Sequence, residues 1–246
     1  MFKDNIFLET SEKLANLSDL TIKNKINDDI FMSEIEIDSR LGKQIKRNKG
    51  KYITITFNDD KLGDHIETLI ETINISINNV LKYLKLSKKS KILFVGLGNK
   101  DITSDKFGYL MIEKISANNK LYKMYKDVEG ITNINSFEFI KSLVSFIDPD
   151  VVFIFDSLKA ENIERLGTTI QISTGGLYPG SAVSDKVNEI SKSTLKRDVI
   201  CVGIPTIINL ESINIDNPYM LISSRDIDRV VDDISSIISL SINRLF

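Results

Sequence analysis

The sequence of 246 residues is poor in cysteine and histidine, with one of each, and has no tryptophan and four prolines. Because Cys201 is the only cysteine, no intramolecular disulfide can form, which suits a reducing compartment. No segment approaches the ~20 apolar residues that a membrane-spanning helix needs. The N-terminal residues also lack the basic start and apolar run of a signal peptide. We therefore expect a cytoplasmic protein without a membrane anchor.

Several catalytic classes need residues that this sequence holds only once. His65 lies beside the apolar stripe of a predicted helix, where a structural or surface role is favoured over a general base. A Ser-His-Asp or Cys-His arrangement is therefore disfavoured, and no zinc motif of the His-Glu-x-x-His type occurs. Cys201 lies in an apolar run, where a buried thiol is inert. A couple of Ser181 with Lys186 stays open, although nothing in the sequence favours it.

The charge balance also excludes a class of partner. Thirty-two basic and 34 acidic residues give a net charge of −2, which argues against a dedicated nucleic-acid binder. The segment from Lys43 to Lys51 is nevertheless basic. An ordinary solvated turn is the favoured interpretation of this segment, and a patch that attracts acidic residues of a substrate is the alternative.

The apolar pattern predicts an α/β fold in a single domain, residues 1–246, with 1–31 as a polar N-terminal arm. Buried strands that alternate with helices indicate a mostly parallel, mixed sheet with helices on both faces. The short connection between residues 158 and 168 predicts that the strands it joins form an antiparallel pair. Strands are expected at 32–37, 51–57, 91–98, 151–156, 168–173, 199–204 and 220–222, and helices at 61–86, 104–115, 137–146 and from 227 to the end.

Two carboxylates follow two of the predicted buried strands. Asp105 comes after the strand that ends at Gly98, and Asp156 is the last residue of the next. Ligands of open α/β sheets bind outside the carboxyl ends of the strands, so these side chains are candidates for an acid/base pair. A capping role is the alternative for each aspartate, and Asp101 competes with Asp105. The loop 174–181 and residues Pro205 and Thr206 are expected at the same edge.

The glycines at 96 and 98 suggest a second, weaker interpretation. A Gly-x-Gly pair after a strand is typical of a dinucleotide-binding loop, but the third glycine position of that motif is Asp101. A carboxylate there would repel a pyrophosphate. A nucleoside- or nucleotide-binding protein remains the alternative that this pattern leaves open.

Several segments together resemble the spore germination protease family. Val95–Asn99 followed by Thr103, Asp105 and Gly108 is similar to the family pattern VGLGN, a short gap and TPDxLG. The other matching segments are Phe155–Leu158, Glu164–Ser173, Gly176–Ser181, Val202–Thr206, Ser33–Thr56 and Met220–Phe246. Ser104 replaces the family's proline, and Tyr178 replaces a histidine. The chain is also shorter than longer family members after Thr206 and between Gly108 and Phe137.

The resemblance implies an atypical aspartic endopeptidase that degrades small acid-soluble spore proteins during germination, with a fold similar to the hydrogenase maturation proteases. It also implies a homotetramer in the cytoplasm of the spore, no cofactor or metal, and no contact with nucleic acid or membrane. The catalytic aspartates of the family fall on Asp105 and Asp156. Members are made as zymogens that cut themselves near the N-terminus, and the corresponding bond here joins Asn5 to Ile6.

The residues suggest separate roles for the two aspartates. We expect Asp105 to be the base, because a helix start favours the anion. We expect Asp156 to be the acid, because an apolar strand favours the protonated form. Asn99, Gly180 and Ser181 are candidates to hold the substrate backbone, with loop geometry as the alternative. A metal-dependent maturation-type endopeptidase and a non-catalytic relative that binds spore proteins are the other functions left open.

Overall fold

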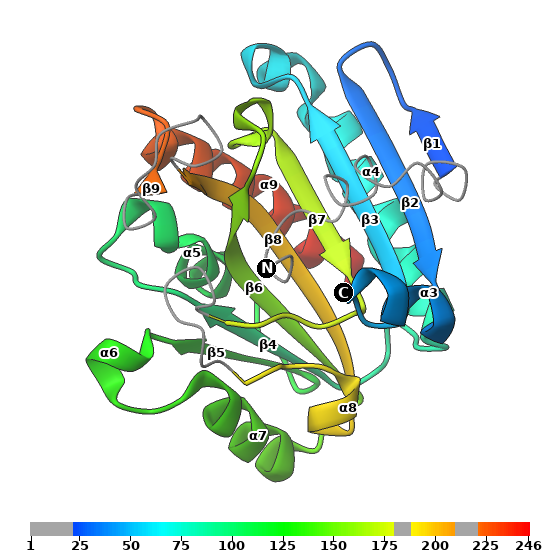
Figure 1. Ribbon diagram of the computed structural model, residues 1–246, viewed down its shortest axis with the longest axis vertical. Coiled ribbons are helices and arrows are strands. Elements are labelled where there is room, and N and C mark those ends of the chain that lie inside the picture. Colours follow the sequence, from blue (N-terminus) through cyan, green and yellow to red (C-terminus); the bar gives the residue numbers. More distant parts are fainter. Residues whose placement is uncertain (1–21, 180–187, 210–220) are drawn as a thin grey trace.

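A computed structural model describes residues 22–179, 188–209 and 221–246, which form one mixed sheet with helices on both faces (Figure 1). The strands run in the order β1-β2-β3-β7-β8-β6-β4-β5, and β9 pairs with the end of β8. Their bounds are Ile22–Lys25 (β1), Ile30–Ile37 (β2), Gly50–Phe57 (β3), Ile92–Leu97 (β4), Leu121–Lys126 (β5), Val151–Ala160 (β6), Thr169–Ser173 (β7), Asp198–Asn209 (β8) and Leu221–Ile222 (β9).

The parallel part of the sheet contains four strands. β5, β4, β6 and β8 run parallel to one another, whereas the pairs β1–β2, β2–β3, β3–β7, β7–β8 and β8–β9 are antiparallel. The predicted α/β class, with a mixed sheet covered on both faces, is confirmed. The parallel part is smaller than the sequence suggested, because β7, β3, β2 and β1 continue the sheet beyond β8 with antiparallel pairing.

The predicted antiparallel pair across residues 158–168 does not form directly. β8 lies between the two strands, parallel to β6 and antiparallel to β7. β7 therefore runs opposite to β6, as expected, without touching it along the ladder. β6 pairs with β8 along its whole length. β7 has five residues, so it could not form hydrogen bonds with all the backbone N–H and C=O groups of the ten-residue β6.

The N-terminal boundary predicted at residue 31 falls inside the sheet. Residues 22–25, which were assigned to the polar arm, form β1 and pair antiparallel with β2, and β2 itself begins at Ile30. All four residues of β1 are exposed, so this edge strand carries no apolar alternation that a sequence pattern could detect.

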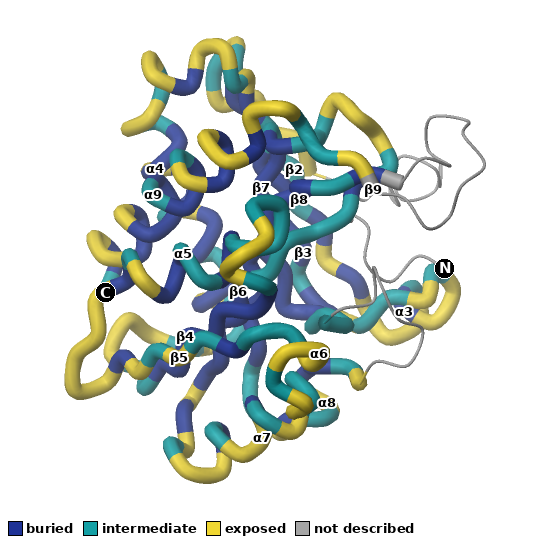
Figure 2. The backbone as a smooth tube through the Cα atoms, turned by 90° about the vertical axis from the view of Figure 1, so that its left-hand side faces the viewer, coloured by how far each residue is buried: buried dark blue, intermediate teal, exposed yellow. Residues whose placement is uncertain are grey.

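The sheet separates two main layers of apolar side chains, each covered by helices. On one face, α4 (Leu62–Tyr83), α5 (Phe107–Lys114) and α9 (Ile227–Leu245) pack against the sheet. The other face is covered by α7 (Ser136–Ile147) and the short α8 (Lys192–Leu195), and α3 (Ser39–Ile45) packs on Ile35, Ile37 and Tyr52. Figure 2 shows the most buried backbone in the central strands, with α4 and α9 on one side.

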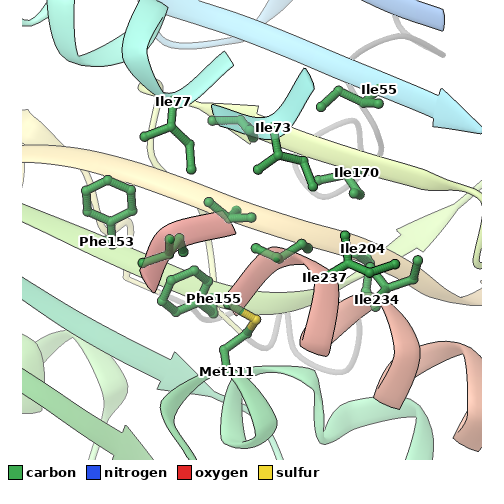
Figure 3. Close-up of a cluster of buried hydrophobic side chains, with 14 of the residues drawn as sticks. Ile55, Ile73, Ile77, Met111, Phe153, Phe155, Ile170, Ile204, Ile234 and Ile237 are labelled. Carbon is green, nitrogen blue, oxygen red and sulfur yellow. The ribbon is translucent and has the colours of Figure 1, made fainter. Parts of the chain in front are cut away.

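Helical spacing explains the larger layer. α4 buries apolar residues three and four positions apart, among them Leu69, Ile73 and Ile77, and α9 does the same with Ile234 and its neighbours. Figure 3 shows Ile73 and Ile77 of α4 and Ile234 of α9 in one cluster with side chains of the sheet, labelled Phe153, Phe155 and Ile170. Each fully buried apolar side chain contributes roughly 1.5–3 kcal/mol, so this layer holds the strands that carry the site. No helix in the described ranges is long and apolar enough to cross a membrane.

Candidate functional site

Asp105 lies in a tight loop that follows β4. Gly98 adopts a φ of 120°, a conformation that favours glycine, and turns the chain at the end of the strand. The loop ends in the short 3-10 helix η2 (Thr103–Asp105). Within it, the backbone N–H of Asn99 donates to Oδ2 of Asp105 at 2.7 Å, and the Asn99 side chain accepts from the backbone N–H of Asp101. Asn99 therefore holds the loop and orients the carboxylate.

The environment of Asp105 favours its protonated form. Burial raises the pKa of this carboxyl from 3.8 to about 6; the hydrogen bond from Asn99 opposes that rise, and the charge of Asp127 adds to it. The expected lowering by a helix start is wrong, since α5 begins two residues later, at Phe107, and desolvation outweighs the single hydrogen bond. A carboxyl with a pKa near 6 is suited to proton transfer close to neutral pH.

Asp156 lies inside β6, four residues before the strand ends. The prediction that it terminates the strand is wrong, because β8 continues to pair with β6 as far as Ala160. Pro205 and Thr206 likewise lie inside β8, at an irregularity in this pairing, and not after it. Asp156 is half-buried and pairs with Gly203, which offers no side chain beside it. Burial and, secondarily, the charge of Asp156 raise the pKa of the Cys201 thiol.

The packing of α5 brings the two aspartate segments together. β4 and β6 are parallel neighbours, with Gly96 opposite Phe155, so the residues that follow reach the same edge of the sheet. A side chain on Gly108 would lie 2.6 Å from the carbonyl oxygen of Phe155, and η2 itself packs against β6, β8 and α9. The loop that carries Asp105 is thus held against the strand that carries Asp156.

The structure adds residues that the sequence interpretation missed. Tyr125, near the end of β5, donates from its hydroxyl to the carbonyl oxygen of Gly98 at 2.8 Å and accepts from the N–H of Lys100 at 3.0 Å. Burial raises the pKa of Tyr125 to about 12. Asp127 is the first residue after β5. These residues went unnoticed because β5 (LYKMYK), at the edge of the sheet, mixes lysine with tyrosine and methionine and has no apolar alternation. The need for a parallel strand between 115 and 136 was the available signal.

The segment that follows β7 begins at the edge of the sheet opposite to the two aspartates. Because β7 is antiparallel to β8, its carboxyl end points to the opposite edge from those of β4 and β6, which corrects the expectation for Thr174 and its neighbours. The chain then crosses the sheet face in front of β8 and β6 (Figure 1). Leu177 packs there and pairs with Ile190. Gly180, Ser181, Asn5 and Ile6 lie outside the described residues, and so does Lys186.

The remaining candidates have structural partners. His65 lies on α4, where its Nε2 is 3.1 Å from Oδ2 of Asp29, far along the chain from either aspartate. Cys201 is buried in β8. Among residues 22–179, 188–209 and 221–246, no three histidine, cysteine, aspartate or glutamate side chains lie close enough together to hold a metal ion.

The chain is similar to known proteins in sequence and, to a lesser extent, in structure. A family model described as germination protease matches residues 3–223. Curated relatives named germination protease include those of Oceanobacillus iheyensis, 31% identical over 85% of this chain, and Bacillus licheniformis, 30% identical over 87%. The chain spans 61% and 62% of the length of these two relatives. A NiFe hydrogenase maturation protease from Thermococcus kodakarensis is 16% identical, with 62% of this chain and 92% of that chain covered and a TM-score of 0.38.

Proposed function

Because this chain belongs to the germination protease family, we propose that it is an endopeptidase with Asp105 and Asp156 as its catalytic pair. The observation that carries the proposal is the partly buried Asp105 carboxyl, which the loop after β4 holds with a pKa of about 6 beside the strand of Asp156. Proton transfer to and from a peptide needs groups that titrate near the working pH. Carboxylates are the candidates because the single histidine and the single cysteine are engaged elsewhere in the fold.

The proposed mechanism uses one water molecule. Asp105, ionised near neutral pH, removes a proton as the water oxygen attacks the carbonyl carbon of the scissile bond. Asp156 in its protonated form donates to the carbonyl oxygen, which gives a tetrahedral diol. The proton held by Asp105 then passes to the leaving amine as the C–N bond breaks, and a hydroxyl of the diol returns its proton to Asp156 as the carbonyl re-forms. The base role for Asp105 thus rests on its pKa near 6, and not on the helix start that the sequence suggested.

The family supports finer proposals about the biological setting. We expect the substrates to be small acid-soluble spore proteins, degraded during germination in the cytoplasm of the spore, and the enzyme to be a homotetramer that needs no cofactor. Activation of a zymogen by cleavage between Asn5 and Ile6 belongs to the same set, as do roles of Asn99, Gly180 and Ser181 in holding the substrate backbone. Each of these proposals rests on membership of the family, and the chain covers 61% of the length of the relative from Oceanobacillus iheyensis.

The test is cleavage of a purified small acid-soluble spore protein by wild type, Asp105→Asn and Asp156→Asn. Asp101→Asn is the matched control, since this aspartate is exposed in the same loop. We expect each catalytic substitution to reduce kcat/KM by about 10²–10⁴ and the control to leave it unchanged. Near wild-type cleavage by folded Asp105→Asn would overturn the assignment. Loss of wild-type activity on chelation would favour the metal-dependent alternative, and binding without cleavage would favour a non-catalytic relative.

A further inference from the structure

A basic pocket lies at the corner between α3 and β3. It has a volume of about 340 Å³, and four of its lining residues are cations: Lys43, Lys46, Arg47 and Lys49. The other lining residues are Ser39, Gly42 and Asn48, so no acidic side chain contributes to the wall. We call this the α3 pocket. It concentrates the charges of the segment that the sequence analysis interpreted first as a solvated turn.

The backbone makes these cations converge. Lys46 ends α3 in a left-handed conformation, with a φ of 56°, and reverses the direction of the chain. Gly42 permits the reversal, because a side chain there would lie 2.5 Å from the carbonyl oxygen of Arg47. The backbone of Arg47 and Lys49 consequently returns beside Gly42, the neighbour of Lys43 in the chain. In a freely extended turn these side chains would spread apart into the solvent.

The lysines of the α3 pocket are unneutralised. Lys43, Lys46 and Lys49 are exposed, and none of them forms an ion pair within the described part of the chain. The next lysine behaves differently: Nζ of Lys51 contacts Oε1 of Glu34 at 2.5 Å. Like charges held together raise the free energy of the folded protein, and a bound anion would lower it.

Hydrogen bonds connect the α3 pocket to the segment that crosses the sheet. The Asn48 side chain donates to the carbonyl oxygen of Gly175 and to Oε1 of Glu189, both at 2.6 Å. Oε2 of Glu189 in turn accepts from the Tyr178 hydroxyl at 2.9 Å. The pocket is therefore fixed to the chain that leads from β7 across β8 and β6 (Figure 1), toward the strand of Asp156.

We infer that Lys43, Lys46 and Lys49 form a subsite for the carboxylates of an acidic segment in the substrate protein, separate from the bond that is cleaved. The inference rests on the proposed function for the identity of the substrate as a protein. Such a subsite would hold the substrate by complementary charge and speed its encounter with the enzyme, while the aspartates act elsewhere along the same polypeptide.

A peptide suits this pocket better than a nucleic acid does. Nucleic-acid binders spread positive charge along a face to follow successive phosphates, and the protein as a whole is usually basic. Here the net charge is −2, and the four cations belong to one segment of seven residues around a single pocket. A short cluster of carboxylates matches that size.

The test measures binding by the uncut protein, so it does not depend on hydrolysis. A fluorescent decaglutamate peptide is titrated into Asp105→Asn protein with the α3 pocket intact, and into the same protein with Lys43, Lys46 and Lys49 changed to Gln. The matched control changes Lys85, Lys88 and Lys89 to Gln, which removes the same charge from an exposed turn after α4. We expect the pocket variant to raise Kd by about tenfold and the control to change it little.

Equal losses in the two lysine variants, or no loss in the pocket variant, would overturn the inference. So would a single-stranded 12-nucleotide DNA that binds more tightly than decaglutamate and depends on the same three lysines. A second arm compares cleavage of peptides with acidic and neutral flanks by the enzyme with Asp105 restored, where only the acidic peptide should lose kcat/KM in the pocket variant. Absence of cleavage in every variant, with the binding result intact, would defeat the proposed function alone.

Discussion

The carbonyl oxygen of Gly108 occupies the space that a side chain on Gly96 would need: a Cβ built there would lie 2.0 Å from it. The same is true on the helix side, where a Cβ on Gly108 would lie 2.2 Å from the carbonyl oxygen of Leu97 in β4. Backbone thus packs directly on backbone where α5 crosses β4. This close approach holds η2 and Asp105 against the carboxyl ends of the strands.

Substitution of either glycine should therefore destabilise the protein. Gly96→Ala forces backbone apart in the core, and we expect a loss of about 3 kcal/mol or more in the free energy of unfolding, measured by urea denaturation. Gly63→Ala is the control: it lies on α4 with no atom within 4 Å of the added Cβ. That change should stabilise the protein by about 0.5–1 kcal/mol. Equal stability of the two variants would contradict the packing argument.

The carboxyl of Asp105 should destabilise the folded protein at neutral pH. Its folded-state pKa is raised from 3.8 to about 6, so the cost is absent below pH 3.8, grows between 3.8 and 6, and is complete above 6. A shift of about two pH units corresponds to about 3 kcal/mol. Asp105→Asn should consequently have a higher Tm than wild type at pH 7.5 and the same Tm at pH 3.5.

Calorimetry across this pH range would measure the difference. Asp101→Asn, in the exposed part of the same loop, should show no such growth with pH. If the Tm difference between Asp105→Asn and wild type were constant from pH 3.5 to 7.5, burial would not control this carboxyl.

Burial chiefly sets the acidic limb of the pH–rate profile, and the charge of Asp127 should shift it further. A base with a pKa of about 6 is protonated below that pH, so kcat/KM should fall about tenfold per pH unit there. Asp127 raises the pKa of Asp105, and Asp127→Asn should move this limb to lower pH. Glu113→Gln, which removes an exposed charge from α5, is the control and should leave the limb in place. If the limb of Asp127→Asn stayed in place, the charge of Asp127 would not influence the pKa of Asp105.

Cys201 should be unreactive in the folded enzyme. Burial raises the pKa of its thiol, and only the thiolate reacts with disulfide reagents. We expect no labelling by Ellman's reagent at pH 8 until urea unfolds the chain, when one thiol per chain should react. Cys201→Ala should retain peptidase activity. Rapid labelling of the native protein together with inactivation would point instead to a cysteine at the site.

The local patterns of the sequence were sufficient for most of the elements. Period-two alternation predicts β2 and β3, and spacings of three and four predict α4 and α9 within a few residues of their observed ends. The two helices bury one face, and the two strands hold apolar residues that alternate over part of their length, so burial leaves a record in the order of residues. β1 and β5 leave none, because edge strands with exposed or charged side chains are held by backbone pairing to a neighbour.

The candidate site divides in the same way. Sequence alone determined the α/β class and singled out Asp105 and Asp156, since both follow or lie within buried apolar runs and the usual nucleophile partners are missing. Tertiary structure decided the surroundings of Asp105, which raise its pKa by burial and by the charge of Asp127. It also decided the gathering of lysines in the α3 pocket, away from both aspartates. Burial and the electrostatic field depend on segments far apart in the chain, so the spacing of residues close in sequence cannot predict them.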